Sequence, residues 1–408
     1  MADQSFDQGK VTRRRVFYIP GYDPFHPRRY RELYRKEGTA QAQISGYTLD
    51  LKPKSAAGRY GWQVTSLIDD IKVEAQVEVL VWSDIVKESM ATGIAATYTQ
   101  LFKTAWIYIG SGALFRLMRL RKGPVIAALY PVVFLLGQLG IAAAVVWAFS
   151  AIGARLTPWG GAVGLAFGLG AAVGLLHWFR RIDNKIFAYY LMHDYAYSAR
   201  FQGANPSELE ARMAVFRDGI ADALTEDVEE VLVVGHSSGV HIGVSVLADL
   251  IRAGRVPADG HVLSFLSLGQ VVPMVSFLPK AQRLRADLAY LSASRALVWV
   301  DVTAPGDGCA FALCDPVAVS GVAPVEKRWP LVFSAAFTQS LSPHRWRELR
   351  WKFFRLHFQY LCAFDRPRDY DYFQITAGPL TLGARYAGRV ASGSRIERAV
   401  NKFTTVLP

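Results

Sequence analysis

A five-residue motif, Gly-His-Ser-Ser-Gly at residues 235–239, constrains the fold of this chain more than any other feature. It follows an apolar, β-branched run at residues 228–234 and precedes a helix-like stretch at residues 240–251. A strand that turns at once into a helix needs small residues at the corner, where they let the backbone close and project the central serine from the sheet. The motif therefore predicts a sharp strand-to-helix turn with Ser237 at its tip; the alternative is an ordinary turn that happens to contain serines.

Strand-like and helix-like segments alternate through most of the remaining chain. We expect further strands at residues 14–19, 77–82, 262–268, 296–302 and 331–337. We expect helices at residues 28–42, 206–225, 279–291 and 345–362. Apolar strands that alternate with helices are typical of a parallel sheet with both faces covered. The predicted fold class is therefore α/β, with a mostly parallel sheet covered by helices.

Two long apolar runs interrupt this pattern, at residues 124–152 and 158–179, and neither contains Asp, Glu, Lys or Arg. Each exceeds the roughly 20 residues that a helix needs to cross the hydrocarbon core of a membrane. We expect a transmembrane helical hairpin inserted into the α/β domain, although two core helices of a soluble domain would share the composition. The predicted organisation is a first part of the domain at residues 1–84, a membrane insertion at 85–204 and a second part at 205–408.

Basic residues flank the two apolar runs. They are Arg116, Arg119, Arg121 and Lys122 before the first run and Arg180, Arg181 and Lys185 after the second, with Arg155 alone in the connection. Positive residues stay on the cytoplasmic side of a membrane. We therefore expect an integral protein of the inner membrane, with the α/β domain in the cytoplasm and the connection outside.

The second apolar run repeats glycine at four-residue spacing, at Gly160, Gly164 and Gly168 and again at Gly170 and Gly174. Such a stripe gives a smooth helical face for close packing. Its partner is either the first run or another copy of the protein, so a homo-oligomer through this face is an expectation. Two aromatic segments lie beside the hairpin. Residues 91–117 fit an interfacial helix or a poorer third span, and residues 187–201 fit a membrane-interface belt or a helix packed under the domain.

The net charge of +12 points to an anionic partner. Because the basic residues gather around the apolar runs and no nucleic-acid motif is present, we expect membrane lipids and no nucleic acid. The three cysteines, Cys309, Cys314 and Cys362, give no disulfide framework. Cys309 and Cys314 are too few and too far apart for a convincing metal site, so we interpret these two as packing residues. The chain has no phosphate-binding loop and no glycine-rich dinucleotide motif, so we expect no metal and no cofactor.

A serine hydroxyl is a poor nucleophile unless a base takes its proton and an acid orients that base. In a sheet of this kind the acid follows a later strand. Asp307 lies past the strand at residues 296–302, after a Pro-Gly turn, and is the first choice. Asp301, within that strand, is the second choice, and Asp315 is the third.

Two histidines compete for the role of base. Its position supports His344, because it follows the last predicted strand. Its environment supports His357, because it shares a helical stripe with Trp346, Phe353 and Tyr360 and should face the interior. We favour His357. Two backbone N–H groups must also stabilise the developing oxyanion. We expect one from Ser238 and the other from Tyr22, in the loop after the first strand.

The chain resembles the α/β-hydrolase superfamily, in its serine lipase and esterase branch. The resemblance rests on residues 235–239, the Pro-Gly-Tyr-Asp-Pro loop at residues 20–24, the loop of Asp307 and the His-Phe-Gln-Tyr segment at residues 357–360. It covers roughly residues 14–84 and 205–365.

The resemblance implies a nucleophile at Ser237, an acid at Asp307, a base at His357 and oxyanion donors at Tyr22 and Ser238. Two departures stand out. Many members carry His-Gly where this chain has Pro-Gly at residues 20–21, and the inserted hairpin is not needed by the core fold.

Three functions follow from these expectations. The first is a membrane-anchored serine hydrolase that cleaves an ester, with a lipid or membrane-derived acyl group as substrate. The second is an acyltransferase, which would pass the same acyl group to an alcohol or amine instead of water. The third is a non-catalytic membrane scaffold that keeps the fold without the chemistry.

Overall fold

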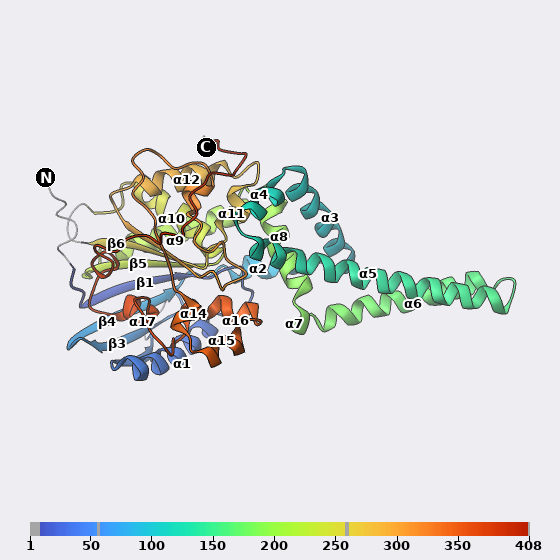
Figure 1. The fold of residues 1–408 in the computed structure, drawn as a ribbon, viewed down its shortest axis with the longest axis horizontal. Coiled ribbons are helices and arrows are strands. Elements are labelled where there is room, and N and C mark those ends of the chain that lie inside the picture. The colour runs from blue at the N-terminus through green and yellow to red at the C-terminus, as the bar shows by residue number, and fades with distance from the viewer. Residues whose placement is uncertain (1–8, 55–57, 258–260, 407–408) are drawn as a thin grey trace.

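The computed structural model describes residues 9–54, 58–257 and 261–406. The first eight residues of the predicted segment 1–84 therefore lie outside the described residues. An eight-stranded sheet forms the centre of the molecule, in the order β2-β3-β4-β1-β5-β6-β7-β8 (Figure 1). The strands are β1 (Arg13–Ile19), β2 (Thr48–Pro53), β3 (Gly61–Ile68), β4 (Ile71–Val79), β5 (Glu230–His236), β6 (Val262–Leu268), β7 (Val298–Thr303) and β8 (Leu331–Ser334).

Strands β4, β1, β5, β6, β7 and β8 pair in parallel, whereas β2 and β3 form an antiparallel edge. The α/β fold with a mostly parallel sheet is thus confirmed. The antiparallel edge was not predicted, and the strand expected at residues 77–82 begins six residues earlier, at Ile71. The link between β3 and β4 is a two-residue turn at Asp69 and Asp70, with φ of 52° and 60°. Aspartate tolerates this left-handed backbone, which makes the pair a hairpin signal.

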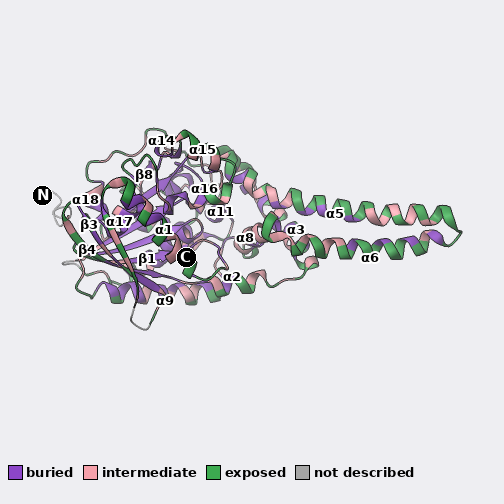
Figure 2. Cartoon of the chain, turned by 90° about the horizontal axis from the view of Figure 1, so that it is seen from below, coloured by how far each residue is buried: buried purple, intermediate pink, exposed green. Residues whose placement is uncertain are grey.

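Helices cover both faces of the sheet. They are α1 (Arg28–Ser45), α2 (Ser83–Met90), α9 (Ser207–Ala223), α10 (Gly239–Arg252), α11 (Val272–Ser276), α12 (Gln282–Ala293), α13 (Pro316–Val319), α14 (Phe337–Ser340), α15 (Pro343–Leu349), α16 (Phe353–His357), α17 (Tyr372–Ala377), α18 (Leu382–Arg385) and the 3-10 turn η2 (Phe358–Leu361). Adjacent residues of β1 point to opposite faces of the sheet. Val16 packs in the cluster that contains α1 and α17, whereas Phe17 packs in the cluster that contains α9 and α10. Figure 2 shows the resulting buried sheet.

The helix expected at residues 345–362 is instead three short pieces, α15, α16 and η2. Lys352 leaves helical geometry, with φ of −98° and ψ of 67°, although no proline or glycine lies nearby. The common stripe predicted for Trp346 and His357 therefore does not exist. The break lets the end of α16 pack onto the sheet edge, where the ring of Tyr360 lies against Gly269.

Seven helices separate β4 from α9 in the chain. They are α2, α3 (Ile94–Gly110), α4 (Ala113–Leu120), α5 (Lys122–Leu156), α6 (Gly160–Arg181), the single-turn α7 (Asp183–Ile186) and α8 (Ala188–Arg200). Helices α5 and α6 lie side by side and project together away from the sheet (Figure 1). The first part of α5 packs against α3, α4 and α8, where Val125 and Leu135 are buried.

Glycines let α5 and α6 approach closely. A Cβ on Gly164 would lie 2.2 Å from the carbonyl oxygen of Phe149, and a Cβ on Gly168 would lie 2.9 Å from the Cα of Val146. The stripe that begins at Gly160 therefore packs against α5 of the same chain. Gly170 and Gly174 have open space within 4 Å, so contact with another copy through that face stays a prediction.

Both α5 and α6 are long and apolar enough to cross a membrane. Only 17% of the residues in the most apolar 18-residue window of each helix are buried. Large apolar side chains that are more than half exposed include Val133, Trp147, Ile152, Leu156, Phe167 and Val173. The core helices of a soluble domain bury such side chains. The exposed apolar faces of α5 and α6 therefore differ from the faces of core helices.

Candidate active site

Ser237 occupies the sharp corner between β5 and α10 that the Gly-x-Ser-x-Gly pattern predicts. Its φ is 57°, in the left-handed region that costs a non-glycine residue roughly 1–2 kcal/mol. The Ser237 amide donates a hydrogen bond to the carbonyl of Leu268, 2.9 Å away, which ties the corner to the end of β6. Strain held in this way is typical of a functional position.

The flanking glycines are required by close backbone contacts. A Cβ on Gly235 would lie 2.9 Å from the Cα of Val240, and a Cβ on Gly239 would lie 2.2 Å from the carbonyl oxygen of Ile19. Real Cβ atoms do not approach this closely. The two glycines therefore permit the corner for steric reasons, as the sequence predicts.

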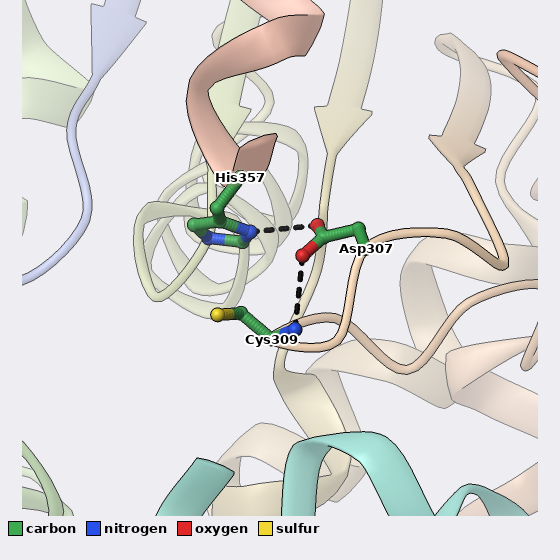
Figure 3. Close-up of side chains that lie close together, drawn as sticks. All are labelled: Asp307, Cys309 and His357. Carbon is green, nitrogen blue, oxygen red and sulfur yellow. Dashed lines mark hydrogen bonds and ion pairs between the residues drawn. The ribbon is translucent and has the colours of Figure 1, made fainter. Parts of the chain in front are cut away.

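Asp307 and His357 form a buried pair, drawn in Figure 3. Asp307 follows β7, and His357 ends α16. The Nδ1–H group of His357 donates to Oδ2 of Asp307 over 2.7 Å. Two more donors hold the carboxylate: the hydroxyl of Tyr360 reaches Oδ2 at 3.0 Å, and the amide of Cys309 reaches Oδ1 at 2.9 Å. Burial by itself raises the pKa of Asp307, but the His357 ring and these hydrogen bonds bring the pKa below its ordinary value.

His236, the second residue of the motif, holds His357 from behind. Its Nε2–H group donates to the carbonyl oxygen of His357 over 3.0 Å, and the two ring centroids are 4.8 Å apart. Burial lowers the pKa of His236 to about 3, and the neighbouring His357 lowers it further in the same direction. His236 is therefore neutral at pH 7, and it acts as a positioning residue for His357.

Ser237 and His357 line one cavity of about 90 Å³. Both side chains lie in the described part of the chain, and no hydrogen bond joins them. Catalytic hydrogen bonds are often long in the absence of substrate and tighten when it binds. The structure thus brings Ser237, His357 and Asp307 together. The His357 ring lines the cavity that contains Ser237, and it is hydrogen bonded to the Asp307 carboxylate.

The alternative acids and the alternative base lie elsewhere. Asp301 is buried within β7, where it accepts a hydrogen bond from Ser267, and burial raises its pKa to about 8. Asp315 caps the short helix α13 and forms an ion pair with Lys327. His344 is exposed on α15 and does not line the cavity. None of these three described residues lines the cavity or forms a hydrogen bond with Ser237 or His357.

Tyr22 and Ser238, the predicted oxyanion donors, both line the cavity. A Cβ on Gly21 would lie 3.0 Å from the Cβ of Ser237, so the loop after β1 runs directly beside the serine. The Tyr22 amide, however, donates to Oγ of Ser238 over 2.9 Å. The Ser238 amide, at the N-terminus of α10, has no partner within that helix.

Asp307, Cys309 and His357 also have the donor types of a metal site, since one ligand atom of each lies within 4.8 Å of the others. Their geometry fits a metal poorly. Both oxygens of Asp307 already accept N–H or O–H donors. Burial, followed by the charge of Asp307, raises the pKa of the Cys309 thiol well above its ordinary value, whereas a metal ligand must be a thiolate.

Cys309, His241 and Asp194 are residues of this cavity that the sequence did not assign to the site. Cys309 was interpreted as a packing residue, but it lines the cavity beside His357. His241 lines it from α10, and burial lowers its pKa to about 4. Asp194 reaches it from α8. Asp194 lies one helical turn after Tyr190, which also lines the cavity, so residues 187–201 pack under the domain rather than only at a membrane interface.

A second, apolar cavity of about 120 Å³ adjoins the first. It lies between α3, α4, α5 and α8, and it shares Tyr195 and Met274 with the first cavity. No charged side chain lines it. We call it the apolar chamber.

Comparison of the chain with protein-family models, with curated proteins and with solved structures found no match.

Proposed function

We propose that this protein is a membrane-anchored serine hydrolase that cleaves an ester through an acyl-enzyme. The observation that carries the proposal is the 2.7 Å bond between His357 and Asp307, in the same cavity as a serine held in the left-handed region at the corner of β5 and α10. The resemblance to the serine lipase and esterase branch of the α/β-hydrolase superfamily is consistent with this arrangement.

The chemistry follows from the proton positions. Because Nδ1 of His357 donates to Asp307, Nε2 is the unprotonated nitrogen of the neutral ring and can accept a proton. His357 takes the proton of Ser237 as the hydroxyl oxygen attacks the ester carbonyl, and it then gives that proton to the departing alcohol. A water molecule, activated by the same nitrogen, releases the acid from Ser237. Asp307 stays ionised throughout and stabilises the imidazolium.

The oxyanion donors need one rearrangement. The Tyr22 amide must exchange its bond to Oγ of Ser238 for a bond to the substrate oxyanion. A charged acceptor forms a stronger hydrogen bond than a hydroxyl, so the exchange is favourable when negative charge develops. The Ser238 amide supplies the second donor.

The apolar chamber is suited to the acyl part of the ester. Its wall includes Val125, Ala128 and Val132 of α5, the helix that continues into the exposed apolar pair. An acyl chain that enters beside α5 would pass Tyr195 and Met274 to reach the cavity of Ser237. This placement favours an amphiphilic ester at the membrane surface over a polar soluble ester.

Labelling with a fluorophosphonate probe tests the catalytic proposal. In mild detergent the wild-type protein should be labelled, and peptide mapping should find the adduct on Ser237, because only an activated serine attacks the probe. Ser237→Ala should not be labelled, while Ser342→Ala, which changes an unrelated helix cap, should be labelled like the wild type. No labelling of folded wild-type protein would favour the scaffold function, and transfer of the acyl group to an added alcohol would favour the acyltransferase.

The membrane proposal places α5 and α6 across the bilayer with the catalytic domain in the cytoplasm. The 22 residues of α6 span about 33 Å, and the hydrocarbon core is about 30 Å thick. The Thr157→Cys variant places a thiol in the link between the helices, and this thiol should react with a membrane-impermeant maleimide on intact cells. The thiol of the Lys10→Cys variant should react only after lysis. The wild-type protein is the control that measures labelling of the native cysteines. The opposite pattern would reverse the orientation, and release of the protein by alkaline carbonate would exclude a span.

A further inference from the structure

Asp194 is a carboxyl group in the catalytic cavity that the proposed triad does not use. It lies on α8, is partly buried and lines the cavity of Ser237 and His357. Within the described part of the chain, no N–H or O–H group donates to Asp194 and no Lys or Arg forms an ion pair with it. A partly buried carboxyl group without a partner is unusual in a folded protein, where such groups are paired.

The residues around Asp194 indicate which charge a ligand of this carboxyl group must carry. The cavity lining contains no Lys and no Arg, and its other ionisable groups are histidines, tyrosines and the Cys309 thiol. Phosphate or carboxylate groups would therefore meet one negative charge and no positive one. A cation would meet the Asp194 carboxylate without a competitor.

Aromatic side chains complete the site. Tyr190, Tyr195, Phe354 and Phe358 line the same cavity as Asp194. Aromatic faces attract cations through the ring quadrupole, and a set of aromatic rings is the usual receptor for an ammonium group. The carboxylate and the rings thus favour the same kind of ligand.

The apolar chamber decides which end of the substrate carries the charge. A cation would lose its hydration in the chamber, which offers it no charged side chain. The acyl chain belongs there, so the charge belongs on the alcohol part, in the cavity of Ser237. We propose that Asp194 binds the ammonium group of the alcohol part of an amphiphilic ester; this inference rests on the proposed hydrolase function.

The proposal predicts how substrate selectivity changes with pH. Burial raises the pKa of Asp194 to about 7, and the neighbouring His357 works in the opposite direction. Asp194 is therefore mostly neutral at pH 6 and mostly charged at pH 8. The other titratable groups around it are Tyr22, Tyr108, Tyr190, Tyr195, Cys309, His357, His236 and His241. Burial lowers the pKa of His236 to about 3 and that of His241 to about 4, so both stay neutral between pH 6 and pH 8. Burial moves the pKa values of the tyrosines and of Cys309 upward, away from this range, and His357 affects all substrates alike.

Two isosteric thioesters test the proposal: butyrylthiocholine, and S-(3,3-dimethylbutyl) thiobutanoate, in which carbon replaces the quaternary nitrogen. The ratio of their kcat/KM values cancels the titration of the triad and the fraction of active protein. At pH 8 the wild-type ratio should favour the cation about tenfold or more, and it should fall toward 1 at pH 6. Asp194→Asn should bring the ratio close to 1 at both pH values.

Two further variants serve as controls. Asp194→Glu keeps the negative charge and should keep a preference for the cation at pH 8. Asp50→Asn removes an equal charge from the exposed strand β2, far from the cavity lining, and should leave the ratio unchanged. A wild-type ratio near 1 at pH 8, with both esters hydrolysed, would overturn the role of Asp194 and leave the hydrolase function standing. Hydrolysis of neither ester would count against the hydrolase function itself.

Discussion

Replacement of His357 by alanine should lower kcat for ester hydrolysis by roughly 10⁶-fold, because it removes the base that Asp307 orients beside Ser237 in the cavity. His236 and His241 line the same cavity, but burial lowers the pKa of His236 to about 3 and that of His241 to about 4, which makes both weak bases. His236 also uses Nε2 to bind the carbonyl of His357.

His344→Ala is the matched control for this variant. His344 is exposed on α15 and lies outside the cavity, so kcat should stay within about twofold of wild type. Steady-state hydrolysis of a p-nitrophenyl ester measures both variants, and thermal unfolding in detergent shows whether His357→Ala is folded. If His344→Ala loses the activity and folded His357→Ala keeps it, the base has been assigned to the wrong histidine.

Asp307→Asn should lower kcat by about 10⁴-fold with little change in structure, because it imposes the wrong tautomer on His357. The carboxylate accepts three donors, one from the His357 ring, one from the Tyr360 hydroxyl and one from the Cys309 amide. An asparagine has one oxygen and one NH₂ group. If the NH₂ group faces His357, Nδ1 must lose its proton and Nε2 carries it, so the ring cannot accept the proton of Ser237. If the amide flips, its NH₂ group meets the Cys309 N–H.

Asp301→Asn is the matched control, because Asp301 is equally buried and lies in the strand that leads to Asp307. Burial raises the pKa of Asp301 to about 8, so the group is mostly a neutral acid at pH 7, and an amide is close to it in shape and charge. We expect kcat within a few-fold of wild type, measured with the same ester. Equal losses in Asp301→Asn and Asp307→Asn would argue that both act through stability and that neither is the acid.

How far the sequence predicted the site differs from residue to residue. The corner at Ser237 was predictable, because the need for Gly235 and Gly239 comes from backbone contacts within a few residues of the corner and from one neighbouring strand. The choice between His344 and His357 rested on one argument each, position after the last strand for His344 and an apolar environment for His357. The stripe used to favour His357 was wrong, since the helix breaks at Lys352, and the reason for preferring Asp307 was only its place after a strand.

The fold divides in the same way. The apolar runs predicted α5 and α6 to within four residues at each end, because a long uncharged run admits few conformations. The β2–β3 edge was missed, because no residue of β2 is buried and its place in the sheet is settled by pairing with β3, which pairs in turn with β4. Only the paired sheet shows that Asp69 and Asp70 form the hairpin turn.

Short-range sterics and hydropathy act along the chain, and they specify the serine corner, the alternation of strands and helices and the pair of apolar helices from the order of amino acids alone. The meeting of His357 with Asp307, 50 residues apart, and the entry of Asp194 into the same cavity depend on strand order and on how α8 and α16 pack. Those contacts join residues whose separation in sequence carries no information about their distance in space, so only the folded chain decides them.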